Sequence, residues 1–168
     1  MQSITGLAPS GSLGSGSNIE AFKRGLSLEP HFIGQDAGST DMGPYYHGSA
    51  TPFLPRATYK HDLAIMLKAA RQARIPLLVG SVLTSGCDST LETGLEIIRE
   101  IAKEEGLSFR MAAIRAEIPK AELKRRMASE TFESLGPEGP LTDDIIDRCG
   151  PISAQMGTEP FVRALDAG

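Results

Sequence analysis

Cysteine is scarce in this chain, which has only Cys87 and Cys149, far apart in the sequence. Two such residues form neither a closely spaced metal-binding pair nor the disulfide framework of a small secreted protein. No apolar run approaches the roughly 20 residues that a membrane-spanning helix needs. The N-terminus also lacks the charged segment followed by an apolar one that marks a signal peptide. We therefore expect a soluble protein in the reducing cytoplasm, with no membrane partner.

Positive charge is not in excess either. The formal net charge is -4 and the isoelectric point is near 5.4. The chain thus lacks the basic surface that usually binds nucleic acid, and we expect no nucleic-acid partner. Apolar residues make up 40% and charged residues 23%, which is typical of globular proteins. A length of 168 residues suits one domain, so we expect a single domain over residues 1–168.

Strand patterns alternate with helix patterns along most of the chain. Short apolar runs predict strands at residues 3–8, 31–35, 75–82, 109–114 and 152–155, and helices are predicted at 19–26, 58–74, 89–105, 120–128, 143–148 and 159–165. This alternation is typical of βαβ units. We therefore predict an α/β fold with three layers, in which helices cover both faces of a mostly parallel, Rossmann-like sheet. Ligands of such folds bind beyond the carboxyl ends of the strands.

Glycines gather in the loop after the first predicted strand, at Gly11, Gly14 and Gly16. A loop of this kind before a helix can bind an anion through its backbone N–H groups, although a plain flexible turn is the alternative. The acid Asp36 lies about 20 residues downstream, where a dinucleotide-binding acid would stand. The glycine order is nevertheless wrong for a dinucleotide site, because Ile19 occupies the third glycine position. The pattern argues against NAD, NADP and FAD.

The loop after the second predicted strand, Asp36–Ser49, is dense in polar groups. Its candidate ligand-binding side chains and backbone positions are Asp36, Gly38, Ser39, Thr40, Asp41, Tyr45 and Tyr46. The two carboxylates are candidates for holding a divalent metal, for binding substrate hydroxyls or for acid–base catalysis. The alternative is structural: the aspartates form turns and the tyrosines cover the sheet edge. A lone loop histidine, His47, is more typical of a solvated or structural group than of a base.

Two further loops lead from predicted strands to the same edge. Ser81 is a substrate-binding candidate at the end of the 75–82 strand, and Cys87 precedes a helix, where a thiol pKa can be lowered. A nucleophilic Cys87 would need His47 or His61 as its base, and an inert small residue in a tight loop is the alternative. Glu117, just past the 109–114 strand, is a third candidate catalytic carboxylate.

Three segments, at residues 33–46, 116–118 and 154–161, resemble the acyclic terpene utilisation (AtuA-like) family. The pattern D-A-G-S-x-D-x-G-P-Y-Y that begins at Asp36 is long and specific, and Gln155 lies in the last segment. The chain departs from the family pattern at His47 and Cys87. Family members are longer, so the resemblance implies that this chain corresponds to the N-terminal part of a longer protein. It also implies a role in the catabolism of acyclic terpenes and related carboxylates.

These observations predict an enzyme of small-molecule catabolism that acts on a carboxylate or acyl thioester by lyase, hydratase or isomerase chemistry. Asp36 and Asp41 would orient the substrate or a metal, Glu117 would act as acid or base, and the amides of residues 11–16 would bind an anionic group. The substrate-binding set adds Ser81 and Gln155. The alternative is a non-catalytic subunit or ligand-binding module completed by a partner chain, and in either case we expect a homo-oligomer or a partner subunit.

Overall fold

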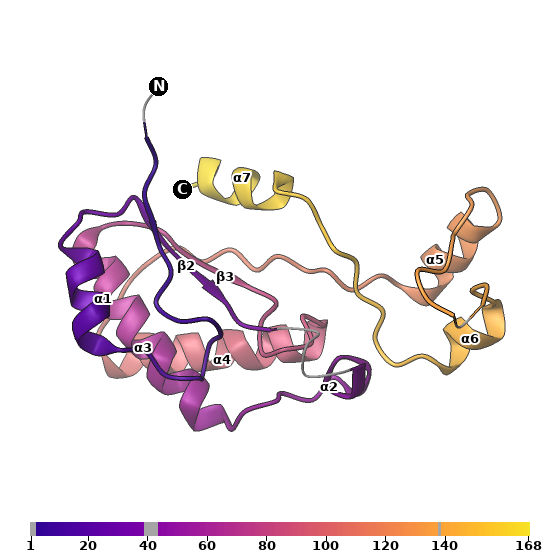
Figure 1. The fold of residues 1–168 in the computed structure, drawn as a ribbon, viewed down its shortest axis with the longest axis horizontal. Coiled ribbons are helices and arrows are strands. Elements are labelled where there is room, and N and C mark those ends of the chain that lie inside the picture. The colour runs from indigo at the N-terminus through magenta and orange to yellow at the C-terminus, as the bar shows by residue number, and fades with distance from the viewer. Residues whose placement is uncertain (1–2, 39–43, 138) are drawn as a thin grey trace.

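The computed structural model describes residues 3–38, 44–137 and 139–168. The elements in chain order are β1 (Gly6–Leu7), α1 (Ile19–Leu26), β2 (Phe32–Asp36), α2 (Pro44–Ser49), α3 (Arg56–Ala73), β3 (Leu77–Gly80), α4 (Asp88–Glu104), α5 (Lys120–Met127), α6 (Asp143–Arg148) and α7 (Glu159–Asp166). Figure 1 shows α5 and α6 together at one end of the molecule, away from the sheet. No helix in the described ranges is long and apolar enough to cross a membrane.

The sheet has three parallel strands in the order β1-β2-β3. Ile33 of β2 stands opposite Leu7 of β1 and Leu77 of β3, and Asp36 stands opposite Gly80. Because all three strands run the same way, the loops that follow them meet at one edge. Asp36 ends β2 and Ser81 follows β3, so these two predicted site residues lie at this edge.

Helices α3 and α4 pack against each other and form the core with the sheet (Figure 1). Their inner faces and β2 contribute side chains that are almost fully buried: Ile33, Leu63, Met66, Leu67, Ile97 and Ile101. Burial of each such side chain stabilises the fold by roughly 1.5–3 kcal/mol before the entropic cost of ordering it.

Polar side chains cap two of the helices at their N-termini. The Asn18 side chain accepts a hydrogen bond from the N–H of Ala21 at 2.9 Å and begins α1, and Thr142 caps α6 in the same way. Gly106 follows α4 with a φ of 62°, the left-handed conformation expected of a glycine after a helix.

The α/β class is confirmed, but the sheet is smaller than predicted. Residues 109–114 and 152–155 are extended without joining it, and their neighbourhood contains one antiparallel bridge, between Glu117 and Ser153. An extended segment becomes a strand only when its backbone pairs with a neighbour, and these segments pair too little. A second difference lies in the segment after β2, which was predicted to be irregular but forms α2.

The chain turns sharply after β3. Ser81, Leu83 and Thr84 all have positive φ, at 49°, 56° and 84°, which is uncommon for residues other than glycine. The turn packs directly on Gly38, where a Cβ atom would lie 2.5 Å from the Ser81 carbonyl oxygen. A glycine at position 38 is therefore required for the loops after β2 and β3 to meet.

We predict that Gly38→Ala lowers the free energy of unfolding by about 1–3 kcal/mol, because the methyl group overlaps backbone atoms that cannot move freely. Gly11→Ala is the matched control, since a Cβ atom there meets nothing within 4 Å. Urea unfolding followed by circular dichroism measures both. Equal stabilities of the two variants would contradict the packing described here.

Candidate functional site

The loops after the three strands are joined to one another by backbone hydrogen bonds. The N–H of Leu13 donates to the carbonyl of Asp36 at 2.8 Å, so the first loop is attached to the end of β2. The N–H of Thr84 donates to the carbonyl of Ala37 at 2.9 Å, which attaches the loop after β3. The predicted convergence of these loops at one edge is therefore present.

A buried carboxylate of the chain itself lies in the glycine loop. Asp62, on α3, is 3% exposed, and its Oδ2 accepts hydrogen bonds from the N–H groups of Gly14 at 2.8 Å and Gly16 at 3.1 Å. These amides were predicted to bind an anion of a ligand, and they hold an anion supplied by α3. Gly11 lies outside this contact and is exposed.

The carboxylate of Asp36 makes a local contact at the end of β2. Its Oδ1 accepts a hydrogen bond from the N–H of Gly38 at 3.1 Å, which is the turn geometry weighed as the structural alternative. Asp36 is exposed, so its carboxylate is also accessible to a ligand. The predicted residues Ser39, Thr40 and Asp41 lie outside the described part of the chain.

Aromatic side chains pack together beside this loop. The rings of Tyr45 and Tyr46 meet edge to face with centroids 5.2 Å apart, and Tyr46 meets Phe53 in the same manner at 5.0 Å. Tyr45 is 68% exposed. Tyr46 therefore has a packing role that ties α2 to residue 53, whereas Tyr45 presents its ring to solvent.

Two polar contacts at this edge were missed by the sequence reasoning. The buried Gln35 donates from Nε2 to the carbonyl of Asp36 at 2.7 Å. The buried hydroxyl of Tyr59 lies 3.2 Å from Thr84 Oγ1 and accepts from the N–H of Leu54 at 3.1 Å. The sequence signal that could have revealed these contacts is a polar side chain at an otherwise apolar position of a strand or helix.

Cys87 is the N-cap residue of α4 and is 1% exposed. Its Sγ lies 2.9 Å from Ser85 Oγ and 3.2 Å from Ser89 Oγ, with Thr90 Oγ1 also in reach. Burial raises the pKa of the thiol, but the hydrogen bonds from these three hydroxyls outweigh burial and leave the pKa lowered. Its burial favours the structural interpretation over a nucleophile, because a substrate cannot reach the sulfur.

Glu117 lies at the N-terminus of α4, close to the edge where it was expected. Its Oε2 accepts a hydrogen bond from the N–H of Asp88 at 2.9 Å. The neighbouring Arg115 pairs with Asp88 at 3.0 Å and with Glu92. These contacts fix the chain after residue 114 against the start of α4.

A large cavity of about 1440 Å³ runs along β3, between that strand and the extended segments near residues 110 and 155. Three predicted site residues, Gly38, Ser81 and Gln155, line it, as does His47. Most of the wall is apolar and comes from β3 and the turn after it, α4, the two extended segments and α7: Leu77, Val79, Val82, Ile98, Met111, Ile114, Met156 and Phe161. The cavity therefore has polar groups near the carboxyl end of β3 and an apolar body.

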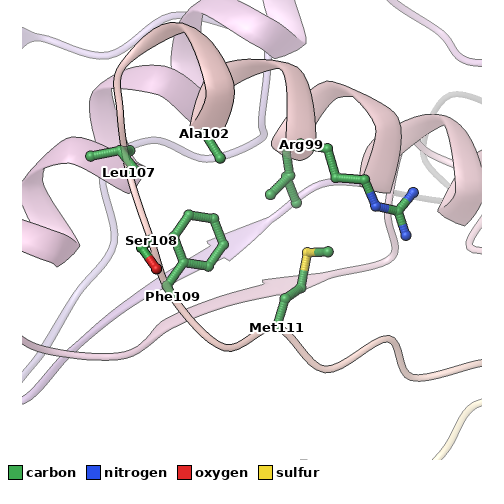
Figure 2. A pocket seen from close by; sticks show the side chains of 7 residues that line it. Arg99, Ala102, Leu107, Ser108, Phe109 and Met111 are labelled. Atoms are coloured by element: carbon green, nitrogen blue, oxygen red, sulfur yellow. The ribbon is translucent and has the colours of Figure 1, made fainter.

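A smaller pocket of about 240 Å³ adjoins this cavity against α4 and shares Ile98, Phe109 and Met111 with it (Figure 2). The ring of Phe109 and the side chains of Ala102, Leu107 and Met111 line it, and the guanidinium of Arg99 points away from the ring. The pocket is mostly apolar, and its polar lining residues are Arg99 and Ser108.

Among the described residues, no group of three or more His, Cys, Asp or Glu side chains is placed to hold a metal ion. No family model, no curated protein and no solved structure matches this chain. The function must therefore be argued from the cavity and the loops that border it.

We predict that Asp62→Ala lowers the free energy of unfolding by about 1–3 kcal/mol, because two N–H groups lose a charged acceptor. The exposed Asp166 on α7 provides the control variant Asp166→Ala, which should change stability little. Chemical denaturation measures both. If Asp62→Ala left the free energy of unfolding unchanged, this result would show that the carboxylate does not hold the glycine loop.

Proposed function

We propose that the cavity along β3 binds an acyclic, branched carboxylate or its acyl thioester, and that the chain belongs to an enzyme that converts this compound by lyase, hydratase or isomerase chemistry. The observation that carries the proposal is the lining of the cavity. Its apolar wall suits a hydrocarbon chain, and its polar groups suit one functional end of that chain.

The charges around the cavity favour an anionic ligand. Among the residues that the structure describes, no Asp or Glu lines the cavity. Arg71, Arg74 and Arg110 line it instead, together with His47. The cavity therefore suits an amphipathic anion, because its arginines match the negative charge and its apolar wall matches the hydrocarbon part.

The resemblance to the acyclic terpene utilisation family supports the same class of ligand. Residues that carry the resemblance, Gly38 and Gln155, line the cavity. In the proposed reaction Asp36 and Asp41 orient the substrate, and Glu117 exchanges a proton with it. Ala116, the neighbour of Glu117, and Ser153, its bridge partner, both line the cavity, which supports this assignment.

We expect geranic acid, an acyclic C10 branched acid, to bind more tightly than geraniol, the matching neutral alcohol. Isothermal titration calorimetry measures both. Ala112→Trp should weaken geranate binding about tenfold (about 1.4 kcal/mol), because Ala112 lines the cavity. Ala113→Trp is the control, because the adjacent Ala113 lies outside that lining. Equal affinity for the two compounds, or no binding, would remove the proposal.

A second candidate, a non-catalytic module completed by a partner chain, is favoured by the outer edge of β3. Residues 77–80 pair with β2 on one side, and within the described ranges no strand pairs with the other side. Such an edge can accept a strand from another chain. We expect light scattering to give a mass above that of one chain if this candidate holds. A monomer that binds and converts a geranoyl compound alone would contradict it.

A further inference from the structure

The three arginines of the cavity all lie at the amino end of β3. Arg71 is in the last turn of α3, and Arg74 ends that helix with a φ of 58°, just before the strand begins. Arg110 follows α4, which runs back from the carboxyl end of β3 to its amino end. The hydroxyl of Ser81 and the amide of Gln155 belong to the opposite, carboxyl end.

These arginines are free of acidic partners among the described residues. The Lys and Arg side chains elsewhere on α3 are paired, such as Lys60 with Glu100 and Glu104 at 2.7 and 2.8 Å, and Lys68 with Glu105 at 2.9 Å. The described ion pairs include none of the three cavity arginines, and the one side-chain hydrogen bond among them runs from Arg110 to the Ala167 carbonyl. Their guanidinium groups can therefore bind phosphate oxygens in pairs.

The distance between the two ends of the cavity indicates which kind of anionic ligand fits it. Pro76 and Ser81 are five residues apart in extended chain, which corresponds to roughly 16 Å at about 3.3 Å per residue. In a free acid the negative charge is on the two carboxylate oxygens, which are bonded directly to the acyl carbon. In an acyl thioester of a phosphorylated carrier, the phosphates are far from that carbon. Cations at one end and polar groups at the other match the second arrangement.

We propose that Arg71, Arg74 and Arg110 bind the phosphate groups of a phosphorylated thiol carrier, so that the ligand is an acyl thioester and its acyl group lies toward Ser81 and Gln155. This inference rests on the proposed function, because it takes the cavity to be the ligand site. It adds the chemical class of the ligand and the direction in which it lies.

Titration calorimetry with three geranoyl thioesters tests the inference: those of pantetheine, of 4′-phosphopantetheine and of coenzyme A. The acyl group is the same in all three, and only the phosphates differ. We expect phosphorylation to tighten binding about tenfold or more, and added salt to reduce this gain. A gain with 4′-phosphopantetheine shows that one phosphate suffices, as on a carrier protein. A gain only with coenzyme A would show that the arginines bind the phosphates of its nucleotide part.

The double variant Arg71→Gln with Arg74→Asn should abolish the gain, so that the three thioesters bind with about equal affinity. Asparagine is chosen at position 74 because it tolerates positive φ. Arg99→Gln with Arg163→Gln is the control, since neither residue lines the cavity. Equal binding of all three thioesters by the native chain would overturn the inference while leaving the proposed function intact. If none of the three thioesters bound and geranate did not bind either, both the inference and the proposed function would be overturned.

Discussion

The buried carboxylate of Asp62 is the interaction on which the candidate site depends. It reaches from α3 to the backbone of Gly14 and Gly16 and so holds the first loop across the end of the sheet. That loop in turn places Leu13 in the core, 1% exposed, and bonds to the end of β2. The loop after β3 is packed on Gly38 at the same edge. The polar end of the cavity therefore rests on internal contacts of the chain.

The acidic residues that pair with cations lie away from the cavity. Acids of α4 pair with cations of α3 on the outer surface, as Glu100 does with Arg56 and Lys60. Glu122 pairs with Arg125 and Arg126 on α5, and the hydrogen bonds from these arginines lower the pKa of that carboxyl to about 2. These acidic side chains are thus engaged away from β3, whereas the three arginines of the cavity lie near the amino end of that strand.

Local patterns predicted the helices well, because caps such as Asn18 and Thr142 act over a few residues. The full sheet could not be predicted from them, since a strand at 109–114 requires a partner backbone that the apolar pattern does not specify. Asp62, which binds the glycine loop, could not be predicted for a related reason. An aspartate on a helix resembles a solvated residue until the loop folds over it. At the site, Ser81 and Gln155 line the cavity, and their role in binding substrate stays a prediction.

The central claim is that the cavity along β3 is the ligand site, and backbone NMR titration with geranate tests it most directly. Saturating geranate should shift the amide signals of Val79, Ser81 and Ala112, which line the cavity, and leave those of α5 and α6 unchanged. Shifts confined to α5, α6 or the small pocket near Ala102, with those three amides unmoved, would contradict the claim.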